Sequence, residues 1–338
     1  TGNMAWTWVS FPLVVIAGCV LAYYLAGVSR GGGVKVNQVE LVDIDAESGL
    51  TRGTSWSHVY SPDTRRFDLE LNPPRLAEGA PSEALLSWQG LPGDAMGGMN
   101  VESSLRLFNQ PYRIASPALP NSDASPRLDG LPIQIGSSKT LLGRWWSDAG
   151  PRRLDKLTLN RIAFRLEGSF GNPLEIELRD CILYYGGQAF VMERSLSPGQ
   201  TVTIDELPAP RTLEWHLTRR RMESSDRSAS GRRSDDQQVQ TASRWDRSGG
   251  NVSRILEVMM LFDAAGGTTY TGLVHHYQDF VDLTPHLGLD RAILVGRAES
   301  PAAVLLRDGR PLTAEYDRRD TWYRFVLPVE RVSGERGE

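Results

Sequence analysis

Cysteine, histidine and net charge are all scarce in this chain of 338 residues. The two cysteines are Cys19, inside an apolar run, and Cys181, in a strand-like segment, and these settings do not suit a mutual disulfide. The formal net charge is −4, so no general basic field attracts nucleic acid. We therefore expect no DNA- or RNA-binding role, and cysteine usage says little about the redox compartment.

Sequence motifs of common enzymes are also lacking: GxGxxG, the P-loop, GxSxG, HExxH and CxxC do not occur. His275, His276 and Asp279 could ligate a metal from one helix, but no second ligand cluster accompanies them. Residues 43–49, "DIDAESG", resemble a calcium loop without its central Gly and closing Glu, and we predict a hairpin turn there. A hydrolase would need His58, His275 or His276 beside a carboxylate and a nucleophile, which the spacing does not indicate. The sequence predicts no catalytic residue, no metal and no cofactor.

Charge is absent from the N-terminal segment up to Arg30, and nearly every side chain from Phe11 to Val28 is apolar. A helix of this length crosses a hydrocarbon core, and we predict a transmembrane helix at residues 5–29 that contacts the lipid bilayer through residues 6–28. Aromatic side chains near both ends resemble interfacial belts: Trp6, Trp8, Tyr23 and Tyr24.

Two other interpretations of this segment remain open. A buried core helix would be expected to have a polar face, which is missing here. A lipoprotein leader would use "IAGC", which ends at Cys19, as its lipid-attachment box, but the apolar run continues nine residues past that cysteine. A spanning helix therefore fits the pattern best.

The remainder of the chain is predicted to be mainly β. Residues 34–150 read as a β-rich membrane-proximal domain, in which the eight prolines of residues 73–130 indicate long surface connections. Residues 151–218 alternate apolar and polar positions between regular turns, which is typical of an immunoglobulin-like β-sandwich. The fold class is thus one or more β-sandwich domains after one transmembrane helix.

The C-terminal part adds a loop, one or two short helices and closing strands. Residues 219–250 contain eight Arg, five acidic residues and many Ser, so we predict a disordered loop, solvated or in contact with anionic lipid or an acidic partner. Residues 251–330 are predicted to hold a helix, capped by Asn251 and stopped at Gly266, followed by closing β-strands.

The segments "WTWVSFPLVVIAGCVLAYYLAG", "VNQVELVDIDAESGLTRGTSWSHVYSPDTRRFDLEL" and "LEGSFGNPLEIELRDCILYYGG" carry a resemblance over most of residues 6–208. The chain resembles the C-terminal half of a family of uncharacterised multi-pass bacterial membrane proteins. The resemblance implies a β-rich domain on the extracytoplasmic side of the bacterial inner membrane. Arg30 and Lys35, just after the span, favour the opposite orientation by the positive-inside rule.

Aromatic residues are the strongest binding candidates that the sequence offers. Trp56, Tyr60, Trp88, Trp145 and Trp146 could line a sugar- or peptide-binding face, although most such rings in a β-sandwich belong to the core. We expect a non-catalytic interaction or scaffold component of a bacterial envelope assembly, with other membrane or envelope proteins as partners. A carbohydrate-binding module of the cell envelope is the alternative, and it needs two or three coplanar exposed rings on one sheet face.

Overall fold

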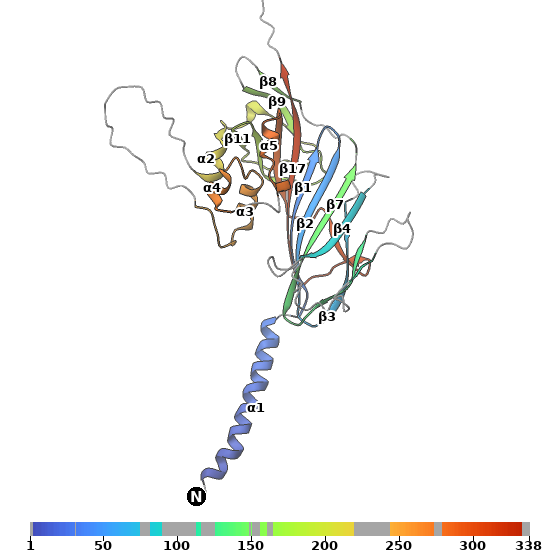
Figure 1. Cartoon of the computed structure of the whole chain (residues 1–338), viewed down its shortest axis with the longest axis vertical. Coiled ribbons are helices and arrows are strands. Elements are labelled where there is room, and N and C mark those ends of the chain that lie inside the picture. The colour runs from blue at the N-terminus through green and yellow to red at the C-terminus, as the bar shows by residue number, and fades with distance from the viewer. Residues whose placement is uncertain are drawn as a thin grey trace, which may run out of the picture. The chain divides into compact units, whose positions relative to one another are not determined.

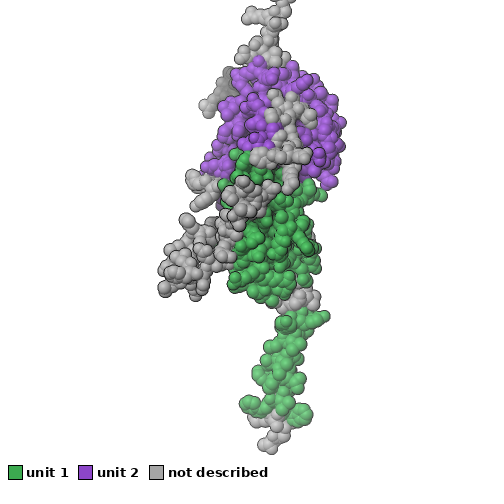
Figure 2. All heavy atoms as spheres, turned by 90° about the vertical axis from the view of Figure 1, so that its right-hand side faces the viewer, with its two compact units in different colours: residues 1–41, 52–147, 299–321 green, residues 42–51, 148–298, 322–338 purple. Residues whose placement is uncertain are grey.

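The structure is a computed structural model that describes residues 3–30, 32–74, 82–89, 113–115, 126–148, 150, 156–160, 165–219, 244–273 and 279–332. This part of the chain is mainly β, with one long N-terminal helix and a few short ones (Figure 1), as the sequence predicts. It divides into two compact units (Figure 2): unit 1 comprises residues 1–41, 52–147 and 299–321, and unit 2 comprises residues 42–51, 148–298 and 322–338. The sequence predicts contiguous domains, whereas these units interleave along the chain.

The N-terminal helix, α1, runs from Asn3 to Arg30 and agrees with the predicted helix to within two residues. Residues Trp8–Leu25 form an 18-residue window with a mean hydropathy of 2.0, and none of this window is buried inside the protein. The helix is therefore long and apolar enough to cross a membrane. Pro12 lies in its N-terminal part, and Cys19 is exposed on it.

Unit 1 contains two β-sheets. One has the order β1–β2–β7–β4, and the other has the order β16–β15–β3–β6–β5. The strands of the first are β1 (Lys35–Asp45), β2 (Leu50–Ser61), β7 (Ser137–Asp148) and β4 (Ser82–Gln89). Those of the second are β16 (Arg310–Pro311), β15 (Val304–Arg307), β3 (Arg65–Asn72), β6 (Arg127–Ile133) and β5 (Arg113–Ala115). Strand β17 (Tyr316–Val332), like β1, runs through both units.

The sheets of unit 1 pack face to face through alternating apolar side chains. Phe67, Leu69 and Leu71 of β3 are almost fully buried, while the residues between them are more exposed. A Cβ atom at Gly143 of β7 would lie 2.6 Å from Cδ2 of Leu71, so only glycine lets the sheets approach this closely here. This arrangement is a β-sandwich.

The predicted long connections over residues 73–130 are partly wrong. Strands β4 and β5 and the start of β6 lie within this range. In β4, Ala84 and Leu86 face the core while Leu85 is exposed, so the period-2 pattern is present in a segment without β-branched residues. The eight prolines that suggested loops lie outside these strands.

Unit 2 contains a sheet of order β13–β11–β10–β14–β17–β1 and a second group, β12–β9–β8, that joins β17 through a parallel pairing with β8. The strands are β8 (Lys156–Asn160), β9 (Arg165–Gly171), β10 (Arg179–Tyr185), β11 (Gln188–Val191), β12 (Thr201–Thr203), β13 (Arg211–Thr212) and β14 (Arg291–Ala298). The short helices are η3 (Ile204–Glu206), α2 (Leu213–Thr218), α3 (Val252–Met259), α4 (Gly267–Thr271), η4 (Asp279–Val281) and α5 (Thr284–Leu287).

The predicted hairpin turn at residues 43–49 is confirmed, and short turns also join two further strand pairs. Residues 46–49 connect β1 to β2, with the Gly49 N–H donating to the Asp45 carbonyl at 2.8 Å, so "DIDAESG" ends in a hairpin turn. Gly186 and Gly187 connect β10 to β11, and Asp308 and Gly309 connect β15 to β16 with positive φ angles of 51° and 74°.

The predicted helix at residues 251–266 is only half as long in the structure. The side chain of Asn251 caps α3 as expected, because it accepts the Arg254 N–H at 3.0 Å, but the helix ends at Met259. The amides of Met260 and Leu261 still donate to carbonyls of α3, but the Asp263 N–H donates to the Asp282 carboxylate at 3.1 Å. Of the predicted loop at residues 219–250, residues 220–243 lie outside the described part of the chain.

Candidate functional site

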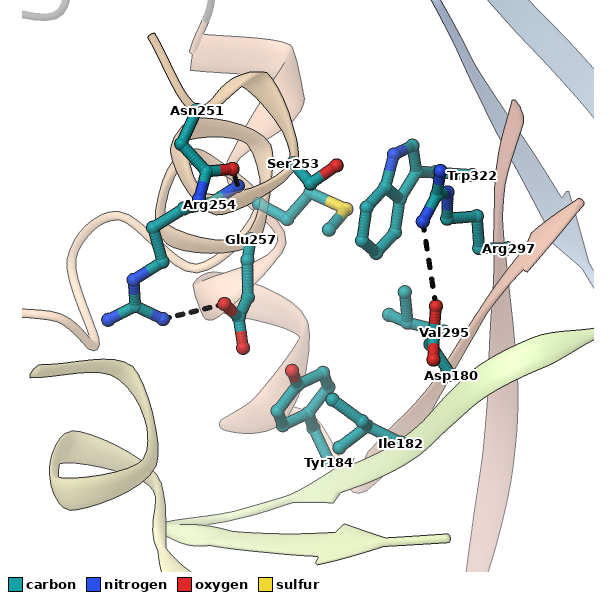
Figure 3. A pocket seen from close by; sticks show the side chains of 11 residues that line it. Asp180, Ile182, Tyr184, Asn251, Ser253, Arg254, Glu257, Val295, Arg297 and Trp322 are labelled. Carbon is teal, nitrogen blue, oxygen red and sulfur yellow. Dashed lines mark hydrogen bonds and ion pairs between the residues drawn. The ribbon is translucent and has the colours of Figure 1, made fainter. Parts of the chain in front are cut away.

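Unit 2 contains a pocket of about 290 Å³ (Figure 3). It lies between α3 and strands β10, β14 and β17, and its volume is near the lower end of the range for small-ligand sites. The residues that line it are Asp180, Ile182, Tyr184, Asn251, Ser253, Arg254, Glu257, Met260, Val295, Arg297 and Trp322.

Strand and helix periodicity bring these side chains together. Ile182 and Tyr184 alternate along β10 and therefore share one face of the sheet, and Ile182 pairs with Val295 of β14. Asp180 lies at an irregularity of the strand between Arg179 and Ile182, where its φ is 52°. Ser253, Glu257 and Met260 are spaced four and three residues apart, so they project from one face of α3 and the turn that follows it. Sheet and helix thus each contribute one wall.

The wall nearest the core is apolar. Tyr184 is 1% exposed, Met260 and Val295 are 2% exposed, and Trp322 is 7% exposed. The indole N–H of Trp322 is buried without a hydrogen-bond partner in the described structure. Burial raises the pKa of the Tyr184 hydroxyl, and the negative charge of Glu257 raises it further, so this phenol stays neutral.

The rim carries two ion pairs. Arg254 Nη1 lies 2.6 Å from Glu257 Oε2, and Arg297 Nη1 lies 3.7 Å from Asp180 Oδ2. Figure 3 shows Glu257 beside Arg254 on α3, above Tyr184, with Asp180 facing Arg297 across the sheet. The four charges cancel, so the rim selects for neither sign overall.

Glu257 also pairs with a buried histidine from α2. His216 Nε2 lies 3.0 Å from Glu257 Oε1, and the side chain of His216 is 7% exposed. Burial acts to raise the pKa of Glu257, but the hydrogen bond from His216 and the neighbouring Arg254 outweigh it, so the pKa is lowered. His216 and Arg254 therefore keep this carboxylate ionised. Both of its oxygen atoms are engaged by these neighbours, so it is not available as a base.

The aromatic candidates from the sequence do not gather at one place. Trp145 is 3% exposed in the core of unit 1, and Trp88 is half-buried with the Lys139 ammonium 3.8 Å from its ring centroid. Trp56 and Tyr60 alternate with buried residues of β2, so they are on its outer face, where both are half-buried. Trp146 is 37% exposed, and its indole N–H donates to Glu83 at 3.3 Å.

The histidine candidates do not form a site in the described part of the chain. His58 is exposed on β2, with Nδ1 3.1 Å from the Thr140 hydroxyl. His275 and His276 lie outside the described residues, and Asp279 begins η4. The described residues contain no group of three His, Cys, Asp or Glu side chains that could hold a metal.

Comparison with known proteins gives little beyond this geometry. No protein-family model and no curated protein matches the chain. Two solved structures of a yeast protein are similar at a low level. One is titled "Yeast delta-COP-I mu-homology domain complexed with Dsl1 WxWxV peptide", with 7% identity, a TM-score of 0.31, and coverage of 88% of this chain and 98% of that one. The other is titled "Yeast delta-COP-I mu-homology domain", with 6% identity, a TM-score of 0.30 and the same coverage.

The sequence did not single out the pocket residues. Tyr184 and Ile182 were visible only as members of an alternating strand, and Glu257 and Arg254 only as polar residues of a short helix. The available signal was the charged face of α3 next to an apolar stripe, which becomes a site only when β10 and β14 are placed beneath it.

Proposed function

We propose that this chain is a membrane-anchored, non-catalytic binding protein, held by α1 and recognising another membrane or envelope protein through the pocket of unit 2. The observation that supports it most is the 18-residue window of α1, which is uncharged and has no part buried against the protein. In water such a surface would be unfavourable, whereas a bilayer accommodates it. The resemblance to bacterial inner-membrane proteins favours an extracytoplasmic position for the β-rich part.

The pocket suits an apolar side chain of a protein partner. A volume of about 290 Å³ with an aromatic and aliphatic floor fits one large side chain, and a charged rim is common around such anchor sites. The alternative, a carbohydrate-binding module, has less support because Trp56, Tyr60 and Trp146 share an outer sheet face without forming one platform.

Alkaline extraction of membranes tests the anchor. The full chain should stay in the membrane pellet, whereas a variant that lacks residues 1–30 should be released. The Cys19→Ser variant should remain in the pellet, since a spanning helix does not depend on a lipidated cysteine. Release of the full chain would contradict anchoring, and release of the Cys19→Ser variant alone would support the lipoprotein interpretation.

Protease accessibility tests the orientation. The β-rich part should be cleaved in intact spheroplasts and protected in inverted vesicles. The reverse pattern would place it in the cytoplasm, as Arg30 and Lys35 favour.

Site-specific photo-crosslinking tests the pocket. A photoreactive residue at Ser253, on the half-exposed rim, should give a defined adduct with a membrane or envelope protein. The matched control places the same photoreactive residue at position 197, where Ser197 is an exposed turn residue of unit 2, and it should give no adduct. Equal labelling at both positions would contradict recognition through the pocket.

A further inference from the structure

Unit 1 has one end at which the chain arrives from α1, and we call it the linker end. Only residues 31–34 separate Arg30, the last residue of α1, from Lys35, the first residue of β1. A chain of this length spans at most about 18 Å. If α1 crosses a bilayer, the start of β1 must lie close to the lipid headgroups, whatever angle the helix adopts.

The strand register fixes which other residues share the linker end. The Lys35 ammonium lies 5.5 Å from the Tyr60 ring centroid, which places the end of β2 beside the start of β1. Arg65 of β3 pairs with Ile133 of β6, so the turns on either side of these residues are neighbours. The Gly136 N–H donates to the Ser61 carbonyl at 3.0 Å, and the Ile135 N–H donates to the Thr64 hydroxyl at 3.0 Å. The turn between β2 and β3 and the turn between β6 and β7 are thus hydrogen-bonded to each other at this end.

An apolar side chain projects from this tied pair of turns. Ile135 is 52% exposed, and Gly136 beside it has a φ of 67°. Polar residues, glycine and proline are the usual occupants of exposed turns, so an exposed β-branched residue at a tip has no stabilising role in water. At a membrane surface the same side chain would be buried among headgroups and acyl chains.

Aromatic and basic side chains share the linker end with Ile135. Lys139 lies over the half-buried Trp88 ring, and Lys35 lies near Tyr60. Rings of this kind are enriched at membrane interfaces, where lysine extends its ammonium toward phosphate. The linker end carries six basic and five acidic side chains: Lys35, Arg65, Arg66, Lys139, Arg318 and Arg319 against Asp63, Asp68, Glu315, Asp317 and Asp320.

The acidic groups of the linker end already have partners. Asp63 pairs with Arg65 at 2.7 Å, Asp317 with Arg319 at 2.6 Å and Asp320 with Arg318 at 3.4 Å. Glu315 accepts the Gly33 N–H at 2.8 Å. Asp68 accepts the Gly130 N–H at 2.6 Å. The excess of one positive charge favours an anionic surface over a neutral one.

We infer that the linker end of unit 1 docks on the membrane surface, with Ile135 inserted at the headgroup level and the surrounding basic side chains in contact with anionic lipid. This inference rests on the proposed membrane anchoring and adds a second, peripheral contact to it. Docking would restrict the tilt of unit 1 relative to the bilayer.

An environment-sensitive fluorophore on the full chain tests the inference. The probe is attached through Ile135→Cys in a Cys19→Ser background, because Cys181 is buried and Cys19 is exposed. The matched control is Leu85→Cys: Leu85 is 48% exposed, and it pairs with Arg144, seven residues along β7 from Ser137 and so about 23 Å further from the tip. Both variants are reconstituted into phosphatidylcholine vesicles with and without an equal share of phosphatidylglycerol.

The expected result is a blue-shifted emission at position 135 that a spin-labelled lipid quenches, with a larger shift in the anionic vesicles and no shift at position 85. Equal, water-like emission at both positions would overturn the docking. Flotation of the same samples separates the two proposals: a chain that fails to float with the vesicles contradicts anchoring, whereas a chain that floats without the shift contradicts docking alone.

A charge reversal tests the lipid contact separately. Arg66→Glu should reduce the shift at position 135 in anionic vesicles by about twofold or more, since one attractive charge becomes repulsive. Lys156→Glu makes the same charge change at an exposed position of unit 2 and should leave the shift unchanged. An equal effect of both substitutions would mean that only net charge matters and would contradict contact at the linker end.

Discussion

Two glutamates, the buried Glu40 of unit 1 and the half-buried Glu257 of unit 2, show opposite electrostatic environments. Glu40 of unit 1 is 1% exposed, and its carboxylate accepts N–H groups of Ala302 at 2.6 Å and Ala303 at 3.2 Å. Glu257 of unit 2 is paired instead with Arg254 and His216. Burial raises the pKa of Glu40 to about 7, since the neutral donors around it offset only part of the burial, whereas the pKa of Glu257 is lowered.

The difference shows that the identity of the neighbours decides the direction of the pKa shift. The N–H and O–H donors around Glu40 offset only part of the effect of burial, whereas the hydrogen bond from His216, together with the charge and hydrogen bond of Arg254, lowers the pKa of Glu257. Arg324 of unit 2 is a buried cation that can be compared with these two carboxyl groups. It is fully buried, and its Nε atom lies 2.6 Å from Oδ1 of Asp43.

Removing Arg324 should have the largest effect on stability. Arg324 also donates to the Val281 carbonyl and so connects β17 to η4. Arg324→Met leaves the Asp43 carboxylate, whose side chain is 13% exposed, without its guanidinium partner. We expect a loss of about 3 to 5 kcal/mol in the free energy of unfolding. Thermal and urea unfolding of the detergent-solubilised chain measure it.

The double variant Arg324→Met with Asp43→Asn provides the control. Because it removes both charges, it should recover a large part of the loss. A double variant as unstable as Arg324→Met alone would mean that the side chain acts through packing and not through its charge.

Glu40 should give the next largest effect, and it should depend on pH. Its folded pKa of about 7 lies above the ordinary 4.5, so the folded state binds the proton more tightly than the unfolded chain. The associated stability is fully present below 4.5 and is lost as the pH rises toward 7, which amounts to about 3 kcal/mol. Unfolding measured between about pH 4 and pH 8 reveals this trend.

Glu40→Gln isolates the contribution of this carboxyl from other titrating groups. The stability difference between the variant and the parent chain should grow in favour of the variant as the pH rises through this window. The same pH dependence in both proteins would show that Glu40 is not the group responsible.

The sequence predicts the class of fold, but it does not predict that Glu40 and Arg324 are buried. Turn residues predicted the hairpin between β1 and β2, since a short turn depends on local backbone preferences. In the sequence Glu40 stands between Val39 and Leu41, and Arg324 stands between Tyr323 and Phe325. Nothing in this local pattern says that a charge there is buried. Two of their main partners, Ala302 for Glu40 and Asp43 for Arg324, lie more than 260 residues away in the sequence.

The pocket and the interleaving of the units were unpredictable for the same reason. Strands β1 and β17 are separated by most of the chain, and the pocket combines β10, α3, β14 and β17. Local patterns identify each element without stating which elements become neighbours. The helix α1 was predictable because its signal, length and continuous apolarity, is entirely local.

Glu257→Gln should show the opposite pH dependence with a smaller effect. Its folded pKa is lowered, so its stabilisation is present above 4.5 and lost as the pH falls below that value. We expect a loss of about 1.5 kcal/mol at neutral pH, since one charge-assisted contact is replaced by a neutral one, and almost none in acid. A difference that does not shrink in acid would argue against an ionised Glu257.

An exposed ion pair should give the smallest effect and completes the comparison. Arg165 Nη2 lies 2.5 Å from Asp205 Oδ1, closer than the Asp43 and Arg324 pair, but the side chains are 61% and 75% exposed. Solvent screens such a pair, and ordering two mobile side chains costs entropy, so Asp205→Asn should change the free energy of unfolding by no more than about 0.5 kcal/mol. Urea unfolding at low and high salt measures it. A larger loss would mean that distance, and not burial or the surrounding charges, governs the contribution of ion pairs in unit 2.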